Sequence, residues 1–568
     1  MKKSLIFLIL FSTLLSIVLF LPYSFHPTNA LPNSIDPVFY AWNLSHNADN
    51  WFKGINALLN TNIFYPLTNT IAYSDTLWGQ SFFLNPIIWI THNPILAQNV
   101  AIILSFPLSA LSMFLLSMYF TKSKSASFAA GIFYAFSYPR LSQIGHLPMI
   151  SSQWLPLYIL YLFKFLESGK LKNVILLCIW YVLSITSSIY FGVFLLPVTV
   201  VIVIGDFLKK MHTHTLYKYK ERFAVLFSII IPFIVIVSIV LFPYIRLKVE
   251  NPEIKRSIDD VTHLRASLID YISVLPTSLN TYKLPINTNE HVLFPTFTLI
   301  LLALLGLVTS RKHNKYMVSI FVLIAFSSFI LSLGNEQSFS IGSFSTGTLK
   351  MPYYYLYKYF PVFQIVRVPA RFGIFVILSL SMLAAWGIKD LSKSLKARWI
   401  IVIFLIFLIE IWQTNTPYVP IASMPKVYQW ILEQPEPIIL AEVPISLFYH
   451  GNIMENQLYR TYGTLQKSDT YALETYRVYF SVFHKKRMIN GYSGFLMESY
   501  NKLTETLENF PADFSIKELR DIGVTHAVVH IRQYENEKRS DIIKALDSSP
   551  LLTLSYSNDD DLVYTIHK

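Results

Sequence analysis

Residues 173–205 read NVILLCIWYVLSITSSIYFGVFLLPVTVVIVIG, without one Asp, Glu, Lys or Arg. A helix needs about 20 predominantly apolar residues to cross the ~30 Å hydrocarbon layer of a bilayer. This stretch is long enough for two short crossings. It therefore predicts a hairpin of two helices embedded in a membrane.

The composition of the whole chain agrees with this interpretation. Of 568 residues, 53% are hydrophobic and 15% aromatic, whereas only 14% are charged. The net charge of +12 does not indicate a nucleic-acid-binding protein, because many Lys and Arg residues fall between apolar runs rather than clustering on a soluble surface. The single cysteine, Cys178, lies in an apolar run, so neither a disulfide framework nor a thiolate metal site can form.

Further apolar runs recur along the first three quarters of the chain. Together with the hairpin they predict about eleven transmembrane helices. The shortest runs give the weakest prediction of a span. The runs outside the hairpin are 4–22, 94–120, 125–139, 147–163, 223–245, 292–310, 316–334, 372–388 and 398–413.

Lys and Arg in short loops mark the cytoplasmic side of a membrane protein. With Lys2 and Lys3 inside, every predicted inside loop is basic, whereas the first outside segment, 23–93, holds one Lys and three Asp. We predict a multi-pass protein of the cell membrane with a cytoplasmic N-terminus and, because the number of spans is odd, an extracytoplasmic C-terminus. Residues 1–30 also fit a cleaved signal peptide, but their apolar core of about 18 residues favours a retained anchor.

After residue 413 the sequence becomes charged and mixed, with β-rich stretches at 437–445, 526–531 and 562–567. We therefore predict a mostly α fold: a polytopic helical membrane domain, 1–413, followed by an exterior soluble α/β domain, 414–568. Within the membrane domain three predicted outer loops are long, and loops of such length often carry function. They span residues 23–93, 246–291 and 335–371.

The first outer loop contains NSIDPVFYAWNLSH, residues 33–46, in which Asp36 precedes a proline. This arrangement is typical of a helix N-cap followed by Pro at the first helical position. A carboxylate at a helix start on the membrane surface also faces the adjacent cavity, so a catalytic role is compatible with capping. Asp75, in NIFYPLTNTIAYSDTLWGQ, precedes another apolar stretch and again fits a cap.

The order of these features resembles the GT-C class of integral membrane glycosyltransferases, which use polyprenyl-phosphate-linked sugars. Several stretches are similar to a group of large bacterial membrane proteins placed in that class: FYPLTNTIAYSD, FAAGIFYAFSYPRLSQIGHLPMISSQWLPL, EHVLFPTFTLILLALLGL, VRVPARFGIF and INGYSGF. The resemblance implies that Asp36, which matches the Asp of the first outer loop, acts as general base or helps to hold a divalent metal. The chain lacks a second acidic residue beside Asp36, so the metal ligands stay open.

A departing lipid phosphate needs positive charge at the membrane surface. VRVPARF places Arg367 and Arg371 four residues apart, and guanidinium groups bind phosphate in a bidentate manner; alternatively both snorkel at the start of the next span. Arg140 and His146, in YPRLSQIGHLP, lie in a predicted outer turn, where the histidine is either structural or a donor to a sugar or phosphate oxygen. We predict that these four residues and Asp75 contribute to substrate binding.

The function predicted from these features is transfer of a sugar from a polyprenyl-phosphate donor to a glycan, lipid or protein acceptor at the outer face, with inversion of configuration. Membrane lipid is an expected partner, and nucleic acid is not. Two alternatives stay open: a translocator of lipid-linked sugars, and a non-catalytic assembly factor of the cell envelope that acts through residues 414–568. The apolar runs carry almost no charge apart from Glu410, which disfavours an ion-coupled transporter.

Overall fold

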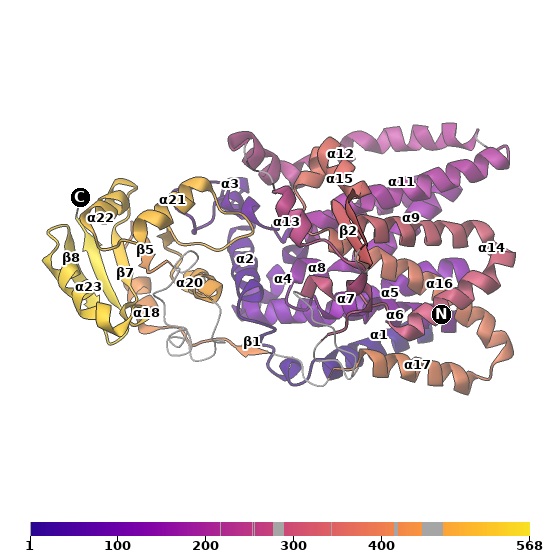
Figure 1. Cartoon of the computed structure of the whole chain (residues 1–568), viewed down its shortest axis with the longest axis horizontal. Helices are drawn as coiled ribbons and strands as arrows, with labels where there is room; N and C mark the ends of the chain where they lie inside the picture. Colours follow the sequence, from indigo (N-terminus) through magenta and orange to yellow (C-terminus); the bar gives the residue numbers. More distant parts are fainter. Residues whose placement is uncertain are drawn as a thin grey trace. The chain divides into compact units, whose positions relative to one another are not determined.

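The chain forms two compact units, each assembled from two stretches of sequence (Figure 1). Met1–Ser24 and Val100–Thr416 form the first unit, and Phe25–Asn99 and Pro417–Lys568 form the second. The computed structural model describes residues 2–215, 217–252, 254, 256–275, 289–341, 344–413, 418–445 and 470–567. The residues that directly follow the predicted boundary at 413, and parts of the predicted loops 246–291 and 335–371, lie outside these ranges.

Every apolar run predicted to span the membrane contains a helix. The hairpin of residues 173–205 is confirmed, since α10 and α11 are separated at Ser188, whose side chain accepts a hydrogen bond from the backbone N–H of Tyr190 and caps α11. The apolar helices are α1 (Lys2–Leu19), α5 (Pro94–Thr121), α6 (Lys124–Ala135), α9 (Leu155–Ser168), α10 (Leu171–Ser187), α11 (Ile189–His212), α12 (Lys218–Glu250), α14 (Phe297–Ser332), α16 (Gly373–Ser394) and α17 (Ala397–Ile411).

The predicted polytopic helical fold is confirmed. Among the described residues, six helices are long and apolar enough to cross a membrane, and Leu171–Ser187 and Phe297–Thr309 are shorter apolar helices. Fewer helices than runs reach this length because α6, α9 and α17 have 12, 14 and 15 residues. Both apolar runs between 292 and 334 fall within α14.

Short elements connect these helices. They include α7 (Tyr138–Leu141), α8 (Leu147–Ile150), α13 (Ile258–His263), α15 (Pro352–Tyr359) and an antiparallel hairpin of β2 (Glu336–Ile341) and β3 (Phe344–Lys350). Single turns of 3₁₀ helix hold Asn289–His291 and Pro369–Phe372. The second and third predicted outer loops are therefore built partly from regular structure.

Two glycines allow α14 and α16 to pack closely. A Cβ atom at Gly306 would overlap the carbonyl oxygen of Leu383, and one at Gly387 would overlap the carbonyl oxygen of Leu302. Helices in a membrane gain little from the hydrophobic effect when they associate, so close packing across small residues supplies much of their attraction.

The second unit holds a five-stranded mixed sheet in the order β6-β5-β7-β9-β8. Its strands are β5 (Ile439–Val443), β6 (Arg487–Met488), β7 (His526–Val529), β8 (Leu552–Ser557) and β9 (Leu562–Ile566). β5 pairs in parallel with β6 and β7, whereas β9 pairs antiparallel with β7 and β8. β5, β7 and β9 lie within the three β-rich stretches predicted from the sequence, and the α/β fold of this part is confirmed.

Three helices pack apolar side chains into one core with this sheet: α21 (Glu498–Leu507), α22 (Asp513–Asp521) and α23 (Asn536–Ser548). α18 (Lys426–Glu433) and α20 (Thr470–His484) belong to the same unit. The same unit contains α2 (Asp36–Asn50), α3 (Ile55–Leu59), α4 (Trp78–Thr91) and a two-stranded antiparallel sheet of β1 (Ala30–Leu31) and β4 (Val419–Pro420). Segments from the predicted first outer loop and from the C-terminal quarter of the chain thus form one folded body.

The contact between α14 and α16 generates a stability prediction. Gly306→Val places a branched side chain against the Leu383 carbonyl, and we expect a loss of about 1–3 kcal/mol from overpacking. The measurement is the thermal unfolding midpoint of the purified protein in detergent. Leu304→Val, at an exposed position of the same helix, is the control; equal midpoints for both variants would contradict the close contact.

Candidate functional site

Asp36 is the first residue of α2, and Ile35 occupies the N-cap position. The N-cap interpretation of Asp36 is therefore wrong. The half-buried carboxylate instead accepts a hydrogen bond at Oδ1 from the hydroxyl of Tyr492, at 2.7 Å. The Tyr492 ring packs edge-to-face against Phe39, one turn further along α2, with the ring centroids 5.5 Å apart. Tyr492 thus fixes the orientation of the Asp36 side chain.

Backbone contacts hold these two residues in place. Residues 62–65 run beside residues 488–490: Met488 N–H donates to the Asn62 carbonyl at 2.8 Å, and Tyr65 N–H donates to the Met488 carbonyl at 2.9 Å. The loop before α2 is tied to α20, because the Thr475 hydroxyl donates to the Ser34 carbonyl at 3.1 Å. Both the segment that leads into Asp36 and the segment that leads into Tyr492 are therefore fixed by hydrogen bonds.

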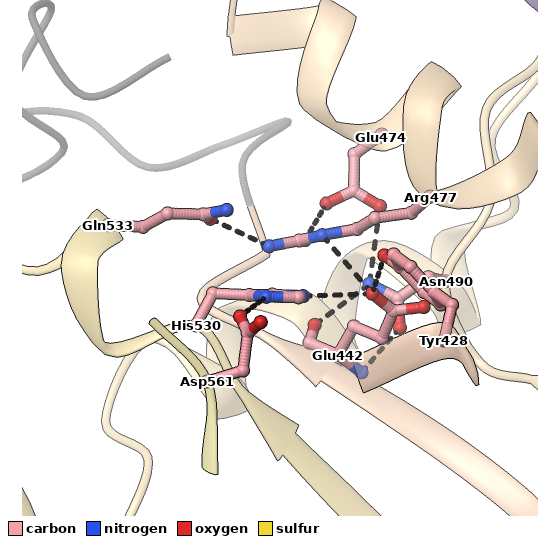
Figure 2. A network of polar contacts seen from close by, with 8 residues as sticks. All are labelled: Tyr428, Glu442, Glu474, Arg477, Asn490, His530, Gln533 and Asp561. Atoms are coloured by element: carbon pink, nitrogen blue, oxygen red, sulfur yellow. Dashed lines mark hydrogen bonds and ion pairs between the residues drawn. The ribbon is translucent and has the colours of Figure 1, made fainter. Parts of the chain in front are cut away.

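A buried polar network anchors these segments to the sheet (Figure 2). At its centre Glu442, on β5, accepts hydrogen bonds at Oε2 from the Tyr428 hydroxyl at 2.6 Å and from His530 Nε2 at 2.9 Å. The other ring nitrogen of His530 lies 2.7 Å from Asp561 Oδ1. We call this set the Glu442 network; its members are Tyr428, Glu442, Glu474, Arg477, Asn490, His530, Gln533 and Asp561.

Arg477 supplies the permanent positive charge of the Glu442 network. Its guanidinium contacts Glu474 on the same helix, donates to Gln533 Oε1 at 2.8 Å and lies 3.7 Å from Glu442. Arg477, Glu442 and Glu474 are fully buried. Burial of charges is tolerated only where partners and hydrogen bonds compensate the lost hydration, so these groups must keep this arrangement.

The electrostatics of the network favour its ionised form. Burial by itself disfavours a charged His530, but its hydrogen bonds to Asp561 and Glu442 outweigh burial and raise its pKa above the usual value. Burial likewise disfavours a charged Glu442, yet the His530 hydrogen bond and the nearby Arg477 hold the pKa of this carboxyl below the usual value.

Asn490 connects the network to Asp36. Its amide donates to the Glu442 carbonyl at 2.9 Å and to Glu474 at 3.2 Å, and its side-chain oxygen accepts from Glu442 N–H at 2.7 Å. Tyr492 follows two residues later. The Glu442 network therefore positions the residue that orients Asp36.

Asp75 belongs to the same unit as Asp36. The side chains of Asn43 and Asn47, on α2, donate to the carbonyl oxygens of Asp75 and Thr76 at 3.2 and 2.8 Å. α4 begins only at Trp78, with Leu77 at its N-cap, so Asp75 is not a cap either. Among the described residues, no group of three or more His, Cys, Asp or Glu could hold a metal ion, and a divalent metal at Asp36 stays a prediction.

In the first unit, a second polar cluster brings His146 and Arg371 together around Glu290. Arg371 Nε lies 3.1 Å from both carboxylate oxygens, Gln143 Nε2 donates at 3.1 Å and His146 Nδ1 lies at 3.8 Å. Burial acts to raise the pKa of Glu290, but Arg371 outweighs it and holds this pKa below the usual value. The adjacent cavity of about 30 Å³ has room for little more than a water molecule.

The remaining two predicted arginines differ in their surroundings. Arg140 is fully buried and donates to the carbonyl oxygens of Ala135 at 2.9 Å and Ile150 at 2.8 Å, the last residues of α6 and α8, so it joins the C-terminal ends of these two helices. Arg367 is half-buried, and within the described part of the chain its guanidinium has no hydrogen-bond or ion-pair partner. Its charge nevertheless contributes to the lowered pKa of Glu290. Arg367 is thus a cation outside any ion pair of the described residues, beside the Glu290–Arg371 pair.

Comparison with known proteins adds to this geometry. No protein-family model and no curated protein matches the sequence. Among solved structures, the arabinofuranosyltransferase AftD from Mycobacteria is similar over 100% of this chain, with a TM-score of 0.59 and 12% sequence identity. This chain covers 40% of the AftD chain, so it spans less than half the length of that protein.

The chain has a GT-C fold. Two further structures were also found. The oligosaccharyltransferase AglB from Archaeoglobus fulgidus has a TM-score of 0.41 and 12% identity, over 99% of this chain and 74% of that chain. ArnT from Cupriavidus metallidurans bound to undecaprenyl phosphate has a TM-score of 0.40 and 10% identity, over 99% of this chain and 97% of that chain. The fold expected from the sequence resemblance is confirmed.

Within this GT-C fold the predicted site residues divide between the two units, with Asp36 and Asp75 in one and the three arginines and His146 in the other. Sequence reasoning singled out neither Tyr492 nor Glu290 as a site residue. Tyr492 lies in INGYSGF, one of the stretches that carry the resemblance. The aromatic stretch YALETYRVYFSVF could have indicated a buried ion pair, because it holds Glu474 and Arg477 three residues apart. Charged residues rarely occur in such apolar surroundings unless they are paired.

The raised pKa of His530 makes the second unit pH-sensitive. Protonated His530 contributes stability in full below its unfolded pKa of about 6.5, and this contribution is lost as the pH rises through the higher folded value. We expect hydrogen exchange in β5 and β7, corrected for intrinsic exchange, to speed up as the pH rises from about 6 to about 9.

In His530→Gln this pH dependence should flatten. The control is His526→Gln, because His526 contacts Thr525 rather than a carboxylate, and its pKa is lowered by burial. The pH dependence should persist in the control. An unchanged profile in His530→Gln would contradict the assignment.

Proposed function

We propose that the chain transfers a sugar from a polyprenyl-phosphate donor to an acceptor hydroxyl at the outer face of the membrane. The acceptor oxygen attacks the anomeric carbon and forms the new glycosidic bond, while the bond from that carbon to the phosphate oxygen breaks. Polyprenyl phosphate leaves with the bonding electron pair, the configuration inverts, and the carboxylate of Asp36 takes the hydroxyl proton.

The observation that carries this proposal is the oriented carboxylate of Asp36. A general base must lie in a fixed geometry relative to the proton that it removes. The Tyr492 hydrogen bond to Oδ1 holds the Asp36 side chain in one orientation, and an ionised carboxylate offers about four acceptor sites, so one hydrogen bond is compatible with proton abstraction. The GT-C fold shared with an arabinofuranosyltransferase supports glycosyl transfer as the reaction.

Arg367 is our candidate for binding the donor phosphate. Both carboxylate oxygens of Glu290 accept hydrogen bonds from Arg371 and neutralise its charge. Arg371 therefore attracts a further anion less strongly than an unpaired arginine would. Arg367 lies four residues away and has no carboxylate partner within the described part of the chain. The Glu290–Arg371 pair then serves to position the VRVPARF segment, while Arg367 contributes the charge.

The central test is donor consumption. Purified protein in lipid is incubated with a panel of polyprenyl-phosphate sugars, and the released lipid phosphate is measured. Asp36→Asn should lower the rate by roughly 10²–10⁴-fold, the usual contribution of a general base. Tyr492→Phe, which loses one hydrogen bond worth about 1 kcal/mol, should lower it roughly fivefold.

Asp559→Asn, at an exposed turn of the same unit, is the matched control and should keep full activity. Equal release from wild type and Asp36→Asn would refute the role of Asp36. Movement of the lipid-linked sugar across vesicles without any release would favour a translocator, and a stable complex through residues 414–568 without either activity would favour an assembly factor.

The phosphate assignment predicts a different kinetic signature. Arg367→Gln should raise the donor KM by roughly 10–100-fold, as expected for the loss of one charge-assisted hydrogen bond of about 1.5–3 kcal/mol. Arg398→Gln, at an exposed position of α17, is the control and should leave KM unchanged. A fall in kcat with an unchanged KM would place Arg367 outside the donor-binding site.

A further inference from the structure

A larger cavity lies elsewhere in the second unit. It has a volume of about 330 Å³, within the range of small-molecule sites, and is formed by the C-terminal half of α2, residues 60–62 and the end of α20. All of its lining residues belong to this unit. At 1.5 Å per helical residue, its α2 residues, from Trp42 to Asn50, lie roughly 9–21 Å along the helix axis from Asp36.

Part of the wall of this cavity consists of neutral polar side chains held by hydrogen bonds, beside the apolar side chains of Trp42 and Val482 and four charged residues. Amides and hydroxyls line it: Ser45, Asn50, Asn60, Thr61, Asn62 and Ser481. The carboxamide of Asn62 is held by Trp42 Nε1 at 3.2 Å and by the Lys486 carbonyl at 3.2 Å. His46 Nε2 lies 3.2 Å from the Leu58 carbonyl, and burial lowers the pKa of His46 to about 4, so the ring is neutral at physiological pH.

The cavity is lined by more positively charged than negatively charged side chains. Asp49 is the carboxylate among its lining residues, and it is paired with Lys485 at 2.8 Å. Lys53 contacts Asn50 Oδ1 at 3.5 Å, and the Arg487 guanidinium lies over the Tyr65 ring, 5.0 Å from its centroid. Over the described ranges neither Lys53 nor Arg487 forms an ion pair, and three cationic side chains, those of Lys53, Lys485 and Arg487, line the cavity beside the carboxylate of Asp49.

We propose that this cavity binds an anionic saccharide, a sugar segment that bears a carboxylate or phosphate group, as a remote part of the acceptor. The proposal rests on the proposed function. Sugar hydroxyls each donate and accept hydrogen bonds, which suits the amides and hydroxyls of the wall, and the apolar face of a sugar ring suits Trp42. Lys53 and Arg487 provide the charge that an anionic substituent requires. The separation from Asp36 fits an acceptor of several sugar units, whose reacting hydroxyl lies far from the anionic segment.

The test is equilibrium binding to the full-length protein in detergent, measured by calorimetry. The probes are an oligogalacturonate, a phosphorylated malto-oligosaccharide, a neutral malto-oligosaccharide of the same length and inorganic phosphate. Both acidic saccharides should bind at least tenfold more tightly than the neutral saccharide and than inorganic phosphate. The double variant Lys53→Gln/Arg487→Gln should lose at least tenfold in affinity for them, and both side chains are exposed, so the fold should survive.

Lys502→Gln is the matched control, because Lys502 is exposed, paired with Glu498 and absent from the cavity. It should bind like wild type. Equal binding of the neutral saccharide, undiminished binding by the double variant, or no binding of either acidic saccharide would overturn the proposal. Binding of inorganic phosphate or phosphatidylglycerol vesicles as tight as that of the saccharides would also overturn it, in favour of a simple anion or headgroup site.

The failure of this proposal can be distinguished from failure of the proposed function. Saccharide binding that persists while wild type consumes no donor would refute glycosyl transfer and support the cavity as a saccharide site. Donor consumption that depends on Asp36, combined with no effect of Lys53→Gln/Arg487→Gln on binding, would support the transferase and refute this cavity as its acceptor site.

Discussion

Glu442 is a carboxylate buried within a protein core, and such a group must be paired or it destabilises the fold. Removal of one partner from a buried ion pair typically costs about 3–5 kcal/mol, because the remaining charge has neither water nor a counterion. Glu442 meets this requirement through His530, Tyr428 and Arg477, which come from three different elements of the second unit. The arrangement of β5, α18, α20 and the end of β7 is therefore specified by electrostatics as well as by apolar packing.

The hydrogen bonds that stabilise Glu442 also connect it to Asp36, the proposed catalytic residue. Asn490 bonds to both the backbone and the neighbours of Glu442, and Tyr492 follows it and donates to Asp36. A rigid, water-excluded polar network is a suitable support for a general base, because a small displacement of a catalytic group strongly reduces the rate. In this protein a sheet distant in sequence supplies that support for a residue at the start of α2.

The first unit follows a different physical rule. Its helices approach each other where glycines remove side-chain bulk, as at Gly306 and Gly387. Its polar cluster is neutralised internally, since Glu290 compensates Arg371, and this leaves Arg367 as the cation available to an anion. The cavity of the second unit shows a similar arrangement, with Lys485 paired to Asp49 and two further cations that form no ion pair within the described residues. In both places an internal ion pair leaves a further cation beside it, and this is the reason for proposing an anionic ligand at each.

The sequence alone determined the membrane character, the positions of the apolar helices and the main strands of the C-terminal sheet, because these depend on hydropathy and periodicity over neighbouring residues. It also singled out Asp36 through a family resemblance and the basic residues of VRVPARF through the chemistry of phosphate binding. Only the tertiary structure decided their partners. Asp36 and Tyr492 are 456 residues apart, and Glu290 and Arg371 are 81 apart, so no local pattern relates them. The N-cap interpretation of Asp36 failed for the same reason: the local Asp-Pro pattern predicts a cap, whereas α2 begins at Asp36 itself and the carboxylate bonds to a tyrosine from the far end of the chain.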